Sequence, residues 1–426
     1  MPQPLGKKTW LITVDMGYGH QRIAFPLRRL AFKDEIIKAN HYLGIPEKDR
    51  AIWEGSRRFY ESISNLKRIP LIGEFIFKVY DSFQKIPQFY PKRDLSKPDL
   101  VLKNLYSLIK KGWGRDLIEK LKKENSRLPL LTTFFASAFM AEVFEYPGEI
   151  FCIVCDADIS RTWAPLQPSI SKIKYLVPNE RVKERLHFYG VKKENIFLTG
   201  CPLPMENIGE NYEILKNDLA FRLFNLDPKK KYFENYQTLI SEFLGALPKK
   251  SDHPLTILFS IGGAGAQKEI ALKAMHSLAQ KIKNSEIKFI VSVGIRSEVR
   301  DYFARIISSL NVEIIYESNI SDYFKKFNQA LRKTDILWTK PSELSFYSGL
   351  GIPIIIAPTI GSQEDFNREW LLKLGSGILQ ENLNYVEEWL FDLLESGWLA
   401  EAAMQGFIET EKMGTYNIER VVNSIL

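Results

Sequence analysis

Short apolar runs alternate with helical segments in two separate series, and this alternation constrains the fold more than any other feature. Each run has the length of a buried strand and ends at glycine, proline or polar residues. Strands that alternate with helices form parallel sheets covered on both faces. The sequence therefore predicts an α/β protein with two doubly wound domains that face a cleft. The expected strands lie in residues 9–15, 128–137, 149–158, 172–178 and 194–204 in the first series, and in 254–265, 286–294, 312–318, 334–340 and 352–358 in the second. Within these ranges, 194–204 ends in a proline-marked exit and 254–265 ends in a glycine loop.

A polar, lysine-rich segment at 205–251 divides the two series and carries no strand pattern. We expect a first domain at 1–204, a connector or insertion with helical pieces at 205–251, and a second domain at 252–405. A C-terminal helix at 406–426 is expected to pack back on the first domain. The 426 residues suit two domains of about 200 residues each. After the first expected strand, residues 21–39 are expected to form one helix.

The composition is that of a soluble globular protein, with 45% apolar and 26% charged residues, which excludes a disordered or collagen-like chain. Three cysteines are too few for a disulfide scaffold, so we expect a cytoplasmic protein. Cys152 and Cys155 lie in an apolar run and are interpreted as buried thiols rather than metal ligands. The five histidines lack metal-site spacing, so we expect no metal. The longest uncharged stretch, Leu344–Gln363, contains glycines and prolines that would break a spanning helix.

Residues 46–124 hold 18 Lys and Arg against 11 Asp and Glu, a surplus of 7 that equals the excess of the whole chain. The same segment is rich in aromatic residues. Basic and aromatic residues together suit an anionic membrane surface, which would make the protein peripheral on the inner face of the membrane. The alternative is a set of amphipathic helices with inward aromatics and a solvated basic face. Nucleic acid is not expected, because no recognition motif accompanies the charge.

Two loops of the first domain carry residues suited to chemistry. Gly17 and Gly19 allow a tight turn and close approach of a ligand, and His20 follows at the start of the next helix. Asp156 and Asp158 follow a strand and suit a base, a metal ligand or a cap. For both loops, a purely structural turn remains the alternative.

Three loops of the second domain follow strands and carry phosphate-binding or polar residues. The first is a glycine loop whose backbone N–H groups suit a phosphate at a helix start. The other two bring hydroxyl, amide, carboxylate and ammonium groups, which suit the many directional hydrogen bonds of a sugar. Solvated loop polarity is the alternative for these two loops, and a helix-start turn that serves packing alone is the alternative for the glycine loop. The candidate residues are Gly262, Gly263 and Gly265 in the first loop, Lys340 and Ser342 in the second, and Gln363, Glu364 and Asn367 in the third.

Together these motifs resemble the GT-B glycosyltransferases. They are most similar to the family 28 type, which includes monogalactosyldiacylglycerol synthase and the lipid II N-acetylglucosaminyltransferase. The resemblance covers about 300 residues. It rests on the order and spacing of the motifs MGYGH, CDADISRTWAP, SIGGAG, TKPSELS, GLGIP and QEDFN, and of the segment from YLVPNERV to TGCPLP.

The resemblance implies two Rossmann-like domains, a UDP-sugar donor and transfer to an acceptor hydroxyl with inversion. A lipid-linked acceptor is included among the expected partners, and no cofactor or metal is implied. His20 would act as the base, with Asp156 as its orienter or as a rival base. The other implied site residues are Gly17, Gly19, Asp158 and Trp163 in the acceptor-side loops; Gly262, Gly263, Gly265, Ile320, Lys340 and Ser342 at the nucleotide diphosphate; and Gln363, Glu364 and Asn367 at the donor sugar.

The chain departs from the family pattern at two positions. Pro204 stands where the family has an arginine near the donor diphosphate. The family's ribose-binding glutamate aligns with Phe346 or Ser348, and Glu343 is the available substitute. Two alternatives therefore stay open: a UDP-sugar 2-epimerase of the same fold, and a non-catalytic GT-B module.

Overall fold

The computed structural model describes residues 7–55, 86–262, 265, 267–307, 310–359 and 361–425. The chain divides into two compact units. Unit 1 consists of Met1–Pro202, Ile360–Asn367 and Met413–Leu426. Unit 2 consists of Leu203–Thr359 and Arg368–Lys412. The two units are described separately below.

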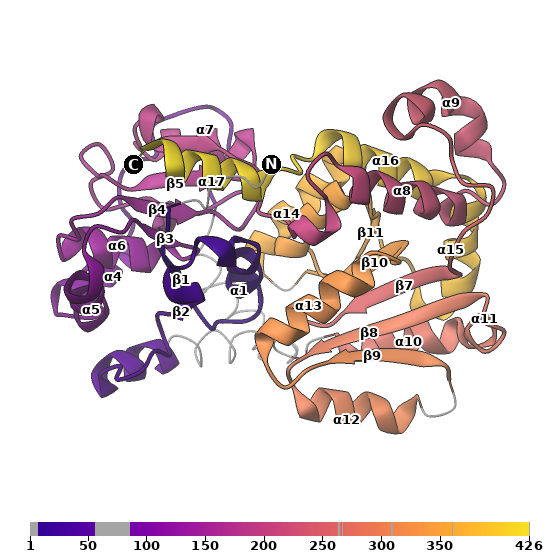
Figure 1. Cartoon of the computed structure of the whole chain (residues 1–426), viewed down its shortest axis with the longest axis horizontal. Helices are drawn as coiled ribbons and strands as arrows, with labels where there is room; N and C mark the ends of the chain where they lie inside the picture. Colours follow the sequence, from indigo (N-terminus) through magenta and orange to yellow (C-terminus); the bar gives the residue numbers. More distant parts are fainter. Residues whose placement is uncertain are drawn as a thin grey trace. The chain divides into compact units, whose positions relative to one another are not determined.

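Unit 1 is built on a six-stranded parallel sheet with the order β2-β1-β3-β4-β5-β6. Helices α4, α5 and α6 lie next to one another in this unit (Figure 1). The strands are β1 (Trp10–Thr13), β2 (Ile37–Lys38), β3 (Leu130–Thr132), β4 (Ile150–Ile153), β5 (Lys174–Val177) and β6 (Ile196–Leu198). The helices are α1 (Gly19–Ala24), α4 (Leu100–Lys110), α5 (Arg115–Asn125), α6 (Phe135–Val143), α7 (Glu180–Phe188) and α17 (Gly414–Ile425).

The strand order of unit 1 reverses between β1 and β3, because β2 lies on one side of β1 and all later strands lie on the other. In open parallel sheets, ligands bind at the carboxyl ends of the strands on either side of such a switch point. The loops after β1 and β3 are therefore the expected place for a site in unit 1.

The central strands of unit 1 are buried on both faces, which explains why they appear in the sequence as continuous apolar runs. Leu11 pairs with Leu131 across β1 and β3, and both side chains are fully buried. Cys152 on β4 and Cys155 just after it are also buried, so the prediction of buried thiols is confirmed.

The single helix predicted at residues 21–39 is wrong. Helix α1 ends at Ala24 and continues as a 3₁₀ helix, Phe25–Leu30, in which Pro26 cannot donate a backbone hydrogen bond. Lys33 and Asp34 then adopt left-handed backbone angles, with φ of +55° and +57°. These residues end the helical path, and the chain returns to the sheet as β2.

Unit 2 is built on a second six-stranded parallel sheet, with the order β12-β11-β10-β7-β8-β9. Its order reverses between β7 and β10, so the loops after these two strands flank the switch point. The strands are β7 (Leu255–Ser260), β8 (Ile287–Gly294), β9 (Val312–Tyr316), β10 (Ile336–Thr339), β11 (Ile354–Ile356) and β12 (Gly377–Leu379). The helices are α8 (Glu213–Leu226), α9 (Lys231–Leu244), α10 (Lys268–Ser277), α11 (Ala279–Lys283), α12 (Ser297–Ile306), α13 (Ile320–Leu331), α15 (Val386–Glu395) and α16 (Trp398–Glu409).

These two sheets confirm the predicted fold class of two doubly wound, Rossmann-like domains. The polar segment at 205–251 forms α8 and α9, which pack with α16 in unit 2 (Figure 1). Arg222 on α8 is fully buried and donates to the carbonyl oxygens of Thr334 at 2.7 Å and Leu350 at 2.9 Å. Helix α8 is therefore fixed to the β10 side of the sheet.

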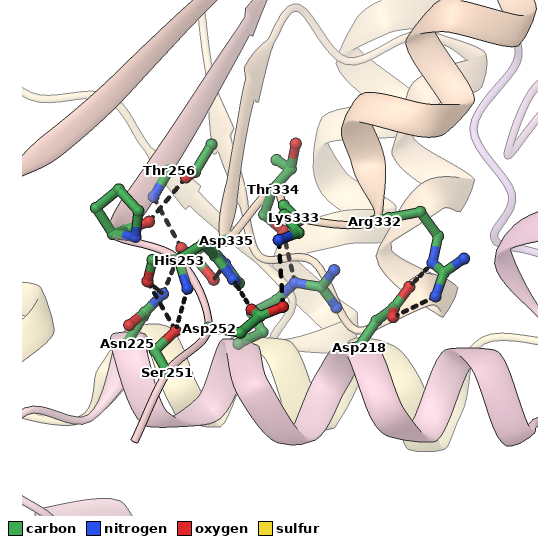
Figure 2. Close-up of polar contacts among 12 residues, drawn as sticks. Asp218, Asn225, Ser251, Asp252, His253, Thr256, Arg332, Lys333, Thr334 and Asp335 are labelled. Carbon is green, nitrogen blue, oxygen red and sulfur yellow. Dashed lines mark hydrogen bonds and ion pairs between the residues drawn. The ribbon is translucent and has the colours of Figure 1, made fainter. Parts of the chain in front are cut away.

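A buried aspartate joins three elements at the amino end of β7 and β10 (Figure 2). Asp335 accepts hydrogen bonds from Asn225 of α8 at 2.9 Å, from the Thr256 backbone at 2.8 Å and from His253 at 3.2 Å. Burial would lower the pKa of His253, but the hydrogen bonds and charges of Asp335 and Asp252 outweigh burial and raise it. Burial raises the pKa of Asp335. This cluster lies at the amino ends of the strands, whereas the switch-point loops lie at their carboxyl ends.

Two distant pieces of sequence belong to unit 1. Two side chains of helix α17 contact the rest of unit 1: Glu419 forms an ion pair with Arg29, and Asn417 donates to the Thr199 carbonyl at 2.9 Å. Residues 360–367, which the sequence analysis assigned to the second domain, also group with unit 1. Helix α14 (Ser362–Leu374) thus begins among residues of unit 1 and ends among residues of unit 2.

Residues 56–85, which form much of the basic and aromatic segment, lie outside the described residues. In the part of the chain that the structure describes, no helix combines the length and the apolar character needed to cross a bilayer.

Candidate functional site

His20 is fixed by a hydrogen bond between the two loops at the switch point of unit 1. Its Nδ1 lies 2.7 Å from the carbonyl oxygen of Thr133, which directly follows β3. Because a carbonyl oxygen only accepts, Nδ1 carries the proton and the lone pair of the neutral ring lies on Nε2. The Cys155 sulfur, from the end of β4, lies 3.5 Å from the same Nδ1. The arrangement selects the tautomer in which Nε2 is the basic nitrogen.

The glycine loop ahead of His20 is held by two amide side chains. Asn40 accepts from the Asp15 backbone N–H at 2.8 Å and donates to the Asp15 carbonyl at 3.0 Å. Gln21 donates to the Asp15 carboxylate at 3.0 Å and to the Gly17 carbonyl at 3.2 Å. Gly17 has a φ of +86° and open space where a side chain would project, so backbone angle rather than crowding requires glycine there.

Aromatic rings surround the His20 imidazole. Phe134 lies edge-on to it, with ring centroids 5.1 Å apart, and Trp163 lies at 6.5 Å. Trp163 is buried and packs on Phe135 at 5.0 Å. Its carbonyl accepts from the Tyr175 hydroxyl at 2.8 Å, and burial raises the pKa of Tyr175, which keeps this donor protonated. These contacts give His20 a largely apolar and well-packed surrounding.

Asp156 and Asn367, which the sequence assigned to different roles, are hydrogen-bonded to each other within unit 1. The Asn367 amide nitrogen donates to the Asp156 carboxylate at 3.1 Å, and the amide oxygen accepts from the Ala157 backbone at 2.8 Å. Asn179, which caps α7, donates to the Ala157 carbonyl at 3.1 Å. Segment 360–367 is therefore joined to the loop that follows β4.

Asp158 is part of a buried ion-pair cluster. Arg185 donates to both of its carboxylate oxygens, at 2.8 and 2.9 Å, and Arg181 donates at 2.8 Å. The Ile159 backbone adds a fourth hydrogen bond at 2.9 Å. The Asp158 side chain is 2% exposed. This saturated carboxylate positions its loop against α7, and the geometry argues against a role as base.

At the switch point of unit 2, Lys340 crosses over Gly262. A Cβ atom built on Gly262 would lie 3.1 Å from Cε and 3.9 Å from Nζ of Lys340. The absence of a side chain on Gly262 therefore lets the ammonium group reach the end of β7. Gly265 has a φ of +69°, which favours glycine, and Gly263 lies outside the described residues. Backbone N–H groups and a cation in this position suit a phosphate.

Four further predicted residues have the following positions. Ile320 is the first residue of α13 and is half-buried. Ser342 is half-buried and immediately precedes the 3₁₀ helix Glu343–Leu350. Gln363 and Glu364 lie in the first turn of α14, where Glu364 is 8% exposed. Their roles stay predictions.

The described aromatic residues of the basic segment mostly face inward. Trp53, Phe89, Tyr106 and Trp113 are buried, with ring centroids of Trp53 and Trp113 4.6 Å apart, whereas Tyr90 is 66% exposed. In the described part of this segment, aromatic side chains therefore build the core of unit 1. The part of this prediction that concerns residues 56–85 lies outside the described residues.

Two contributors to the His20 site were missed by the sequence analysis. Thr133 acts through its backbone carbonyl, which has no side-chain signature; its place within the predicted strand 128–137 was the available signal. Asn40 follows β2, a strand of only two residues with no recognisable pattern. As for metal ligands, the described ranges contain no group of three or more His, Cys, Asp or Glu side chains arranged to hold an ion.

Known proteins are similar to this chain at several levels. A family described as "Domain of unknown function (DUF6938)" matches residues 248–319 and 301–425. The processive diacylglycerol beta-glucosyltransferase of Bacillus subtilis (strain 168) is 21% identical over 398 residues, which cover 91% of this chain and 87% of that protein. The corresponding protein of Bacillus licheniformis is 22% identical over 401 residues, with the same coverage.

Among solved structures, MurG of Acinetobacter baumannii matches with a TM-score of 0.44 and 12% identity, and the match covers 98% of this chain and 99% of MurG. The sequence similarity to the diacylglycerol glucosyltransferases extends through both units. Over most of its length, the chain resembles the GT-B glycosyltransferases of the family 28 type.

Proposed function

We propose that this protein transfers a sugar from a UDP-sugar to an acceptor hydroxyl, with inversion at the anomeric carbon. The observation that carries the proposal is the hydrogen bond from His20 Nδ1 to the Thr133 carbonyl, which makes Nε2 the basic nitrogen. A neutral imidazole in this tautomer is suited to accept the proton of an alcohol as the alcohol attacks.

The reaction is a single displacement. The acceptor oxygen forms a bond to the anomeric carbon while its proton moves to Nε2 of His20. The bond between the anomeric carbon and the diphosphate oxygen breaks, and UDP leaves with the electron pair. The product is a glycoside with the opposite anomeric configuration.

We assign stabilisation of the departing diphosphate to unit 2. Lys340 would supply positive charge, and Gly262 would present its backbone N–H group at the end of β7. The Gly265 N–H already donates to the Gly262 carbonyl at 2.8 Å, so Gly265 is assigned to shaping the loop. Preorganised donors of this kind are most effective where charge develops in the transition state. Ser342 and Ile320 remain assigned to the nucleotide by motif position, and Gln363, Glu364 and Asn367 to the sugar.

Asp156 is assigned an orienting role. Its carboxylate holds Asn367, and through that amide it connects the loop after β4 to segment 360–367. This contact favours positioning of the proposed sugar-binding segment over direct proton transfer. Asp158 is not assigned to chemistry, because two arginines already saturate it.

A lipid-linked acceptor is the best-supported choice. The similar Bacillus subtilis protein is named for diacylglycerol as acceptor, and its similarity covers 91% of this chain. We therefore propose diacylglycerol or a related lipid alcohol, and with it a cytoplasmic protein that works at the membrane surface. The inward aromatics of the described segment mean that membrane contact would have to involve other residues.

The test uses the full chain with radiolabelled UDP-glucose and vesicles that contain diacylglycerol. Lipid-extractable label is expected with the wild-type protein and not with His20→Ala, while the exposed His41→Ala variant serves as the matched control. Absence of transfer across a panel of UDP-sugars and lipid alcohols would contradict the proposal. A parallel incubation with UDP-N-acetylglucosamine and no acceptor separates the 2-epimerase alternative, which would produce an epimer.

A further inference from the structure

The residue that follows the glycine loop of unit 2, Gln267, has an unusual backbone. It caps α10 with φ of +71° and ψ of +15°, in the left-handed region, and its side chain makes no capping hydrogen bond. A residue with a Cβ atom is strained there, and such strain persists only where other contacts impose it. Glycine would adopt these angles without cost.

The Gln267 side chain is anchored to another strand end. Its amide nitrogen donates to the carbonyl of Pro358 at 2.7 Å, just beyond β11. Because a carbonyl oxygen only accepts, the nitrogen must face Pro358, and this fixes which side of the amide holds the oxygen. In the strand order β11-β10-β7, the side chain reaches from the loop after β7 across to the end of β11.

The remaining polar atom of this side chain has no partner. Gln267 is 8% exposed, and its Oε1 lacks a hydrogen-bond partner among the described residues. A buried acceptor left unpaired is unfavourable. A strained backbone, an anchored amide and an unpaired buried acceptor therefore occur together in one residue at the switch point.

We propose that Gln267 Oε1 accepts a hydrogen bond from a hydroxyl of the bound nucleotide sugar. This inference rests on the proposed function and adds a residue that determines how the donor is recognised. The atom is only an acceptor, so it excludes a phosphate oxygen, which at neutral pH is also an acceptor. Hydroxyls of the ribose and of the transferred sugar are the two sources of the required donor.

Two substitutions separate folding from recognition. Gln267→Gly relieves the backbone strain and removes the amide, so the midpoint of thermal unfolding without ligand is expected to stay the same or rise. Gln267→Met keeps the volume of the side chain but removes the donor and the acceptor. Gln280→Ala, on the exposed face of α11, is the matched control.

The measurement is the affinity of each full-length variant for UDP and for UDP-glucose by titration calorimetry. Both Gln267 variants are expected to bind UDP-glucose at least about tenfold more weakly than wild type, and Gln280→Ala is expected to bind normally. An equal loss for UDP places the donor group on the nucleoside; a loss confined to UDP-glucose places it on the sugar.

If both Gln267 variants bind both ligands within twofold of wild type, the inference is overturned while the proposed function stands. If the wild-type protein binds neither UDP nor any of a panel of UDP-sugars, the proposed function fails, and the inference fails with it.

Discussion

In unit 1, the switch point between β1 and β3 holds the His20 imidazole among aromatic rings, whereas in unit 2 the switch point between β7 and β10 holds glycine and the ammonium group of Lys340. The two sheets share parallel topology and the same kind of strand reversal. Fold position therefore tells where a site can form in each unit, and the residues in the loops decide its chemistry.

This difference suggests a division of labour. The His20 tautomer suits removal of a proton, which is an acceptor-side task, and its apolar surroundings disfavour a highly charged diphosphate. Lys340 and the glycine loop suit the diphosphate, on which charge develops as it leaves. The following predictions test or refine this contrast.

The largest effect is expected from His20→Ala. Loss of a positioned base typically lowers turnover by about 10²- to 10⁴-fold. His20→Gln, which cannot accept a proton but keeps a polar side chain, should be similarly impaired. Steady-state kcat measured with saturating donor and acceptor checks this. Turnover within threefold of wild type would remove His20 as the base and shift attention to Asp156.

The sequence alone was sufficient for the sheets and insufficient for this site. Ten strands of the described residues appeared as apolar runs, and the central ones are buried on both faces. The other two were missed: β2 has only two residues, and β12 is the short segment Gly377–Leu379, which begins at a glycine. His20 was singled out by its glycine loop. Its partner is a backbone carbonyl at Thr133, whose position depends on which strands become neighbours. Gln267 was missed for a similar reason: neither its left-handed backbone nor its contact with Pro358 has a sequence signature.

The second prediction contrasts the structural carboxylate of Asp158 in unit 1 with His20, the proposed base. Asp158→Asn leaves the buried Arg185 without its counter-charge and is expected to reduce the free energy of unfolding by about 3 kcal/mol. Glu180→Gln, on the same helix as Arg185, breaks only an exposed ion pair with Lys183 and should change stability by less than about 1 kcal/mol. Urea unfolding measures both. If Asp158→Asn leaves the free energy of unfolding almost unchanged, the two arginines do not need this carboxylate as a counter-charge.

The third prediction concerns the donor side. Lys340→Ala is expected to weaken UDP binding by about tenfold, since one charge-assisted hydrogen bond contributes about 1.5–3 kcal/mol. Lys333→Ala is the control, because Lys333 lies at the amino end of β10, where it pairs with Asp252 at 3.3 Å. Equal losses in the two variants would indicate a general charge effect rather than a site at the switch point.

The smallest effect is a pH dependence of unit 2. The pKa of His253 is raised in the folded state, so protonated His253 stabilises the folded protein. This contribution to the free energy of unfolding is fully present below the ordinary histidine pKa of about 6.5 and is lost as pH rises through the folded-state pKa. The groups that face it are Asp252 and Asp335, with Asn225 and Lys333 nearby (Figure 2). The urea midpoint of wild type is expected to fall between pH 6.5 and 8.5 more than that of His253→Gln. If the urea midpoints of the two proteins fall equally over this pH range, His253 does not cause the pH dependence.

The division of labour is decided by the affinity of His20→Ala and Lys340→Ala for UDP, determined by calorimetry alongside turnover. His20→Ala is expected to bind UDP within about twofold of wild type although its turnover falls by at least about 10²-fold. Lys340→Ala is predicted to bind UDP about tenfold more weakly. Loss of UDP binding in His20→Ala, with normal binding in Lys340→Ala, would contradict the division of labour between the two switch points.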